Sequence, residues 1–129
     1  MKLFQILSLL ALTTIAIFPA SASPAVAPAS IALRDVHGVL QHPLQVGTNK
    51  AVVLIFITDD CPISNSYAPA INKLYSDFGQ KGIAFHLVSV DTGVSAAAIK
   101  KHANQYSYRC EDLLDPKHLL ARQLGATVT

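Results

Sequence analysis

The sequence has little cysteine, no tryptophan and little net charge. Its 129 residues include only Cys61 and Cys110, which is too few for a small domain held together by disulfides. The formal net charge is +2 and no basic run occurs, so a nucleic acid partner is not expected. No two histidines have the spacing of metal ligands, and we expect neither a metal nor another cofactor. The five histidines are His37, His42, His86, His102 and His118.

The first 22 residues have the layout of a secretory signal peptide. Lys2 is followed by an apolar stretch over residues 3–18, and Ala20-Ser21-Ala22 forms a cleavage site of small residues. An uncleaved membrane anchor is the alternative, but the stretch falls short of the roughly 20 residues that span a bilayer. We therefore expect an exported protein, periplasmic or secreted, with no stable membrane span after signal cleavage.

The remainder predicts one α/β domain. Residues 23–30 form a linker rich in proline and alanine, and residues 31–129 form the domain. The unbroken apolar run at 51–57 is typical of a parallel strand buried on both faces. In chain order, the pattern predicts a hairpin over 31–40, a strand at 51–57, a helix ending at Gly79, a strand at 83–90, a helix capped by Ser95, a strand at 112–114, and a helix that begins at Asp115-Pro116 and ends at Gly125.

Reactive groups concentrate at residues 58–64, where the strand at 51–57 ends and a helix begins. A thiol at Cys61 would face unpaired N–H groups and the positive end of the helix dipole, which lower its pKa. Asp59 and Asp60 oppose this, since negative charge disfavours a thiolate. As a pair they are interpreted as solvated loop acids, and Asp91 ends its strand at the same edge of the sheet. A buried, inert cysteine is the alternative for Cys61.

Several motifs then carry a family resemblance. Cys61-Pro62-Ile63-Ser64 resembles the Cys-x-x-Cys motif of thioredoxins with serine in place of the second cysteine, and Pro69 matches the proline that kinks their active-site helix. Thr58 together with Cys61-Pro62 resembles the Thr-x-x-Cys-Pro of peroxiredoxins. The chain from Ile31 onward is similar to the AhpC/TSA-like redoxin family of the thioredoxin-like superfamily.

The resemblance implies a thioredoxin-like fold, with a central, mostly parallel sheet flanked by helices. Residues 125–129 resemble the segment that leads into the cis-proline loop, so we expect the final strands and last helix of the fold to be missing from residues 31–129. It further implies a thiol oxidoreductase in which Cys61 attacks a peroxide or a substrate disulfide, with a peroxiredoxin-like antioxidant favoured. Thr58 would bind the reacting groups, and the backbone N–H groups of residues 62–64 would stabilise the thiolate. The partner would be a thiol reductant or a disulfide-bearing protein.

Departures from the family pattern leave alternatives open. Ser64 excludes a dithiol exchange within the motif, and Arg34, Arg109 and Arg122 show no match to the arginine of peroxiredoxins. Cys110 is a candidate resolving cysteine, although the topology places it at the opposite end of the sheet from Cys61. A copper site like that of thioredoxin-fold copper chaperones would need a second cysteine nearby. The other class of function is a catalytically degenerate module that binds a partner.

Overall fold

The computed structural model describes residues 30–127, so the predicted signal peptide and nearly all of the linker lie outside the described residues. Within this range no helix is long and apolar enough to cross a membrane. The elements, in chain order, are β1 (Leu33–Asp35), β2 (Leu40–Gln41), β3 (Ala51–Ile57), α1 (Pro62–Ser66), α2 (Ala68–Phe78), a 3-10 turn (Gly79–Lys81), β4 (Ile83–Ser89), α3 (Ala96–Gln105), β5 (Glu111–Leu114) and α4 (Leu119–Gln123).

The strands form one mixed sheet in the order β2-β1-β5-β4-β3. The central part is parallel: β3 pairs with β4 from Ala51↔Ile83 to Ile57↔Ser89, and β4 pairs with β5. The β1–β2 hairpin adds antiparallel to β5. Two β-helix-β crossovers in succession therefore bring the carboxyl ends of β3, β4 and β5 to one edge, where ligands and reactive groups gather in such sheets.

The strand before Cys61 is placed differently from its prediction. The β3 bounds match the sequence pattern, but β3 is the last strand of the described sheet, and only Ile57 of its residues is fully buried. Both faces of β3 pack against a core cluster, Val53 and Ile55 on one side and Leu54 and Phe56 on the other, but these side chains are only partly buried, so the prediction of burial on both faces holds in part. Its apolar run reflects contact with β4 and with the core clusters on both faces of the sheet, and the remaining exposure borders a groove described below.

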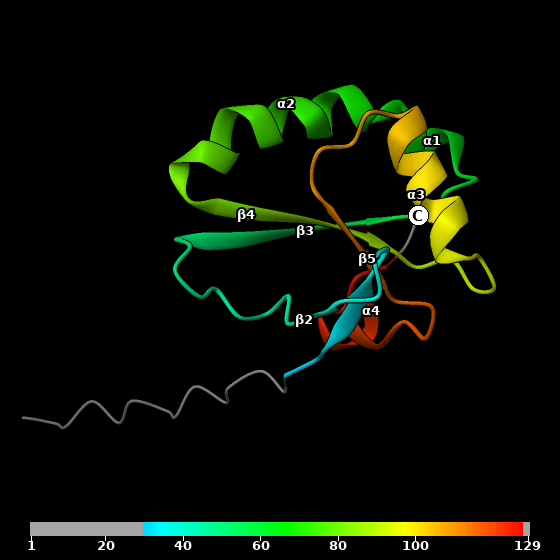
Figure 1. Cartoon of the computed structure of the whole chain (residues 1–129), viewed down its shortest axis with the longest axis horizontal. Helices are drawn as coiled ribbons and strands as arrows, with labels where there is room; N and C mark the ends of the chain where they lie inside the picture. The colour runs from blue at the N-terminus through cyan, green and yellow to red at the C-terminus, as the bar shows by residue number, and fades with distance from the viewer. Residues whose placement is uncertain (1–29, 128–129) are drawn as a thin grey trace, which may run out of the picture.

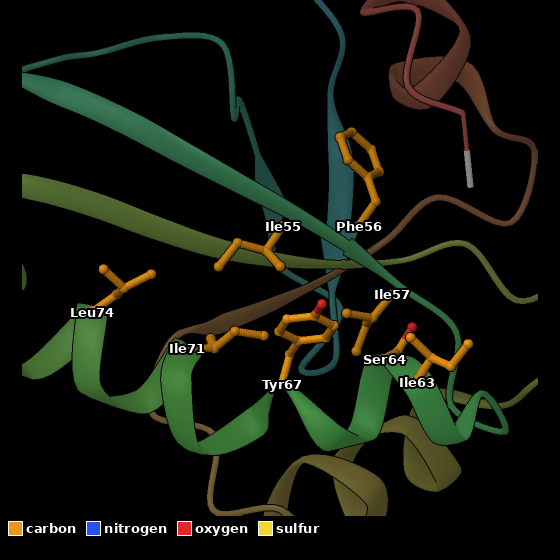
Figure 2. Close-up of a pocket in the computed structure, with 8 residues that line it drawn as sticks. All are labelled: Ile55, Phe56, Ile57, Ile63, Ser64, Tyr67, Ile71 and Leu74. Atoms are coloured by element: carbon orange, nitrogen blue, oxygen red, sulfur yellow. The ribbon is translucent and has the colours of Figure 1, made fainter. Parts of the chain in front are cut away.

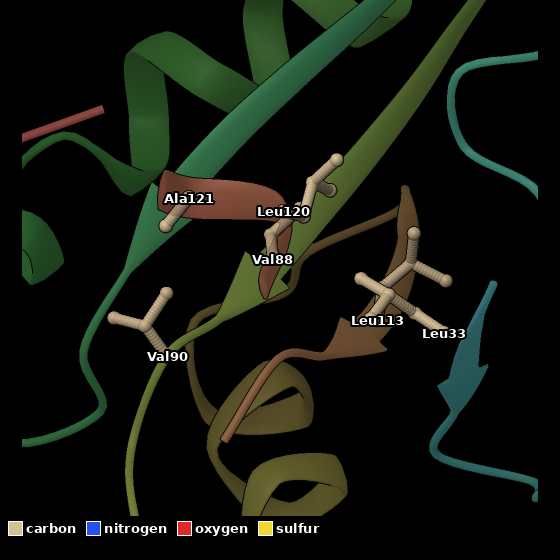
Figure 3. Packing of buried hydrophobic residues seen from close by; sticks show 6 residues of the cluster. All are labelled: Leu33, Val88, Val90, Leu113, Leu120 and Ala121. Carbon is tan, nitrogen blue, oxygen red and sulfur yellow. The ribbon is translucent and has the colours of Figure 1, made fainter. Parts of the chain in front are cut away.

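Helices cover the sheet from both sides (Figure 1). α1, α2 and α3 lie on one face and α4 on the other. Beneath α2, one buried cluster joins Ile57, Ile71, Phe85, Leu87 and Cys110. The other face packs β4 and β5 against α4, as Figure 3 shows for Leu33, Val88, Val90, Leu113, Leu120 and Ala121. Burial of this kind stabilises the fold by about 25 cal/mol for each Å² of apolar surface removed from water.

The predicted helix starts are confirmed in one case and wrong in another. Ser95 caps α3, because its hydroxyl accepts the Ala98 N–H at 3.2 Å. α4 does not begin at Asp115-Pro116 but four residues later, at Leu119. A turn intervenes, since the His118 N–H donates to the Asp115 carbonyl, and the Asp115 carboxylate then accepts the N–H groups of Leu119 and Ala121. Asp115 thus caps the helix across the turn instead of from its first position.

Candidate active site around Cys61

Cys61 is the N-cap residue of α1. Its backbone is extended (φ −83°, ψ 110°), and its Sγ accepts the Ser64 N–H at 3.5 Å. Pro62 fills the first helical position, where the missing N–H leaves no hydrogen bond unmade. The side chain is partly exposed, so a small substrate can reach the sulfur. The sequence thus places a thiol where a helix start leaves amide donors free.

This environment lowers the pKa of the Cys61 thiol, chiefly through the Ser64 backbone N–H and the Ser64 side chain. Ile63 N–H and the Thr58 side chain add smaller contributions in the same direction. Pro62 has no N–H, so the expected contribution of residues 62–64 comes from Ile63 and Ser64 alone. Partial desolvation opposes the lowering. Asp59 and Asp60, which were predicted to oppose it as well, are not among the causes of the shift.

The helix that carries Cys61 is interrupted one turn later. α1 ends at Ser66, Tyr67 (φ −84°, ψ −7°) joins it to α2, and Pro69 lies in the first turn of α2. Proline cannot donate to the preceding turn, so the break follows from the sequence, as the kinking proline predicts. α1 is consequently a short, separate helix whose orientation depends on its side-chain contacts.

Behind Cys61 lies a polar cluster that sequence reasoning missed. The Asn65 amide nitrogen donates to the Asp59 carbonyl at 3.0 Å, and Asn65 Oδ1 lies 2.8 Å from His102 Nε2. Asp91 Oδ2 accepts the Asp59 N–H at 2.7 Å, so Asp91 reaches the loop at the edge where the topology predicts it. The only advance signal was that His102 lies three residues after Ile99, on the buried face of α3.

The prediction of solvated loop acids holds for Asp60 and is wrong for Asp59. Asp60 is exposed, whereas the Asp59 side chain is 16% exposed and its Oδ1 lies 3.9 Å from His102 Nδ1. Desolvation raises the pKa of Asp59, and the Asp91 carboxylate adds to this, while His102 opposes it. The Asp59 side chain faces α3, but neither Asp59 Oδ1 nor His102 Nδ1 has a hydrogen-bond partner. On β5, burial and the charges of Asp59 and Glu111 raise the pKa of Asp112 to about 6.

An apolar groove begins at Ser64, whose N–H contacts the Cys61 sulfur. It has a volume of about 310 Å³ and runs between β3 and the α1–α2 helices, as Figure 2 shows. Ile63 and Tyr67 stand at its mouth and are 63% and 60% exposed. The residues that line it are Ile55, Phe56, Ile57, Ile63, Ser64, Tyr67, Ile71 and Leu74. A ligand in the groove would therefore contact Ser64, the residue whose N–H reaches the Cys61 sulfur.

Cys110 is not brought to Cys61. Glu111, the first residue of β5, pairs with His86 in the middle of β4, whereas Cys61 follows the carboxyl end of β3. Counted along the strands, Cys110 thus lies about four residues, or ~13 Å, before the level at which β3 ends. A disulfide needs Cα atoms within about 7 Å. Both cysteines are free. Burial raises the pKa of Cys110 to about 11, which makes its thiol unreactive near neutral pH.

Neither an arginine nor a metal cluster accompanies the thiol in the described part of the chain. Among residues 30–127, no arginine forms a hydrogen bond or ion pair with Cys61, and Arg34 donates instead to the Gly38 carbonyl at 2.7 Å. The same residues contain no group of three or more histidine, cysteine or acidic side chains placed to hold a metal ion. What the site offers chemically is a single activated thiol beside an apolar groove.

Solved structures share this fold. A secreted disulfide oxidoreductase of Mycobacterium tuberculosis, homologous to E. coli DsbE, superposes with a TM-score of 0.61 at 18% identity, over 74% of this chain and 67% of that one. A bacterioferritin comigratory protein of Xanthomonas campestris, studied for alkyl peroxide reduction, gives 0.62 at 19% identity, over 74% and 59%. A conserved protein of Geobacillus kaustophilus gives 0.70 at 24% identity, over 79% and 57%.

These identities are low enough that the likeness shows the fold and nothing finer. The chain spans less than two thirds of the length of the Xanthomonas and Geobacillus proteins, and no curated protein sequence matches it. The thioredoxin-like fold predicted from the Cys61 motif is confirmed, with redoxins of both the disulfide-exchanging and the peroxiredoxin-like kind among its neighbours. The AhpC/TSA family model matches residues 23–129, and the chain belongs to the AhpC/TSA family.

Proposed function

We propose that this protein is an exported thiol peroxidase in which the Cys61 thiolate reduces a peroxide. The observation that carries the proposal is the hydrogen bond from the Ser64 N–H to Cys61 Sγ at the start of α1. This contact stabilises the thiolate and lowers the pKa of a thiol that solvent can reach. Export is proposed from the signal-like residues 1–22.

The first chemical step forms an S–O bond and breaks the O–O bond. The Cys61 thiolate attacks one peroxide oxygen, the other oxygen leaves with a proton as an alcohol or water, and sulfur becomes a sulfenic acid. The Thr58 hydroxyl would hydrogen-bond the sulfur or the bound oxygen, a role supported by its contribution to lowering the pKa of Cys61. Ser64 and Ile63 supply backbone donors at the same position.

Recovery of the thiol requires an external reductant. Ser64 holds the place of a second cysteine, and Cys110 is separated from Cys61 along the sheet. A first external thiol would condense with the sulfenic acid to give a mixed disulfide and water, and a second would release the Cys61 thiol and an external disulfide. The same arrangement would let Cys61 attack a protein disulfide, but it would then stay trapped as a mixed disulfide until an external thiol arrived.

The test is peroxide consumption by the mature full chain. With a dithiol reductant in excess, the wild-type protein should consume many equivalents of peroxide, and a Cys110→Ser variant should match it. Cys61→Ser should be inactive and serves as the matched control. Consumption of only one equivalent in the presence of reductant would refute the peroxidase and leave the degenerate binding module as the better account.

A further inference from the structure

The contacts of Asn65 fix the orientation of its amide. One end of the side chain lies 3.0 Å from the Asp59 carbonyl oxygen, which can only accept a hydrogen bond, so that end is the nitrogen. The other end is therefore Oδ1, which can only accept, and it lies 2.8 Å from His102 Nε2. His102 must donate through Nε2–H, because two acceptors would not approach this closely.

The ring of His102 is held from several sides. It is 8% exposed, and the rings of Tyr106 and Tyr108 lie with centroids 4.8 and 6.0 Å from it. Its second nitrogen, Nδ1, lies 3.9 Å from Asp59 Oδ1 and has no hydrogen-bond partner, so the hold on the ring comes from Asn65 and the two tyrosines. A buried histidine with its donor committed to one acceptor and its plane fixed by aromatic contacts forms a rigid support for whatever it binds.

What it binds is the segment that carries the thiol. Asn65 is four residues after Cys61, and its backbone N–H donates to the Cys61 carbonyl at 3.0 Å. Its side chain bridges the loop before Cys61 to α3, so loop, α1 and α3 are joined through one amide. α1 has only five residues and no buried side chain, so hydrophobic contacts do little to orient it.

We propose that His102 is a positioning residue for Cys61: through Asn65 it holds α1 against the preceding loop so that the Ser64 N–H stays directed at the sulfur. This role deepens the proposed function and rests on it, because the alignment matters where the Cys61 thiolate is used. Without the support, α1 can turn about the Tyr67 junction, the 3.5 Å contact opens, and the thiolate loses its main stabilising donor.

The test measures the thiol pKa of Cys61 in a Cys110→Ser background, from thiolate absorbance near 240 nm as a function of pH. His102→Leu keeps the volume of the buried side chain and removes the donor. We expect His102→Leu to raise the pKa of Cys61. At a pH below this pKa, the fraction of Cys61 present as thiolate should then fall about three- to tenfold. Asn65→Ala should do the same, and the double variant should be no worse than either single change. Lys101→Ala, on the exposed face of α3, is the matched control and should leave the pKa unchanged.

Rescue separates positioning from loss of packing. Glutamine places its amide nitrogen at the same number of bonds from Cα as His Nε2, so His102→Gln should keep the donor to Asn65 and return the pKa of Cys61 to the wild-type value. If His102→Leu is folded by circular dichroism and leaves the pKa unchanged, the proposal is wrong; if that variant does not fold, Asn65→Ala decides in the same way.

The two proposals fail separately. A wild-type pKa at the level of a free thiol contradicts the proposed function. If the pKa of Cys61 is lowered in the wild type and stays the same in both His102→Leu and Asn65→Ala, only the role of His102 is contradicted. A pKa that responds to these variants in a protein without peroxide turnover supports the positioning role and refutes the peroxidase.

Discussion

At the scale of single residues, Ser64 bears most directly on the redox chemistry proposed for Cys61. It sits where thioredoxins carry a second cysteine, and its N–H and side chain are the two largest contributions to the lowered pKa of Cys61. A lone activated thiol can be oxidised by peroxide without a partner, whereas disulfide exchange needs a second thiolate to release the product. Replacing this one residue therefore tests which chemistry the site is limited to.

Ser64→Cys should convert the site into a dithiol. The N-cap and third helical positions of α1 bring the two side chains together, as the contact between Cys61 Sγ and the Ser64 N–H shows. In a Cys110→Ser background, mild oxidation should remove both free thiols and lower the mass by about two hydrogens, the signature of disulfide formation. The variant should also gain disulfide reductase activity that the parent lacks. Two free thiols after oxidation would show that the α1 geometry does not permit the bond.

Cys110 should behave as an inert thiol in the folded protein. Burial beneath α2 raises its pKa to about 11, so almost none of it is thiolate at pH 8. We expect iodoacetamide to label Cys61 within minutes at that pH and Cys110 only after a denaturant is added, as read by peptide mass spectrometry. Labelling of both residues at equal rates in the native protein would argue for the local unfolding that a resolving role requires.

At the scale of elements, sequence periodicity located most strands and helices because local chemistry determines them. The apolar run of β3 and the Ser95 cap of α3 are examples, since each depends on residues adjacent in the chain. The start of α4 was placed too early because the Asp115 carboxylate reaches across a turn, and sequence spacing does not reveal that the His118 backbone turns left-handed (φ 54°).

The sequence predicts only those features of the candidate site that depend on residues close together in the chain. The N-cap placement of Cys61 follows from the strand-to-helix transition and Pro62. The link from Asn65 to His102 joins residues 37 positions apart, and it exists because two crossovers place α1 and α3 on the same face of the sheet. No spacing rule along the chain relates these two residues, so only the tertiary structure reveals them.

The groove between β3 and α1–α2 leads to a prediction about substrates. Tyr67 and Ile63 present apolar surface at its mouth, next to the Cys61 segment. Tyr67→Ser should raise the KM for a bulky organic hydroperoxide such as cumene hydroperoxide by about three- to tenfold, the cost of losing ~1 kcal/mol of apolar contact. The rate with hydrogen peroxide, which is too small to use the groove, should be unchanged and is the internal control. Equal effects on both substrates would place the groove outside substrate binding.

At the scale of the whole molecule, buried acids beside the thiol loop oppose folding near neutral pH. Asp112 is 8% exposed, its Oδ1 has no hydrogen-bond partner, and its pKa is raised from 3.8 to about 6. The unfolded chain ionises near pH 4 while the folded chain keeps the proton until about pH 6. The contribution of protonated Asp112 to the free energy of unfolding is thus fully present below pH 4 and is lost as the pH rises through about 6.

Asp112→Asn should therefore stabilise the protein in a pH-dependent way. Asparagine resembles the protonated acid, so the free energy of unfolding should equal that of the wild type at pH 4 and exceed it at pH 7 by about 1–2 kcal/mol, less than the full two-unit shift because solvent screens part of the charge. Urea denaturation of both proteins at pH 4, 5, 6 and 7 measures the difference, and Asp60→Asn, at an exposed acid that is not among the causes of the Asp112 shift, is the control for simple loss of negative charge. A difference that is the same at pH 4 and pH 7 would mean that Asp112 is ionised in the folded protein throughout this range. In that case the Asp112 carboxylate would carry its charge within the folded β5 strand, and burial would not hold its proton.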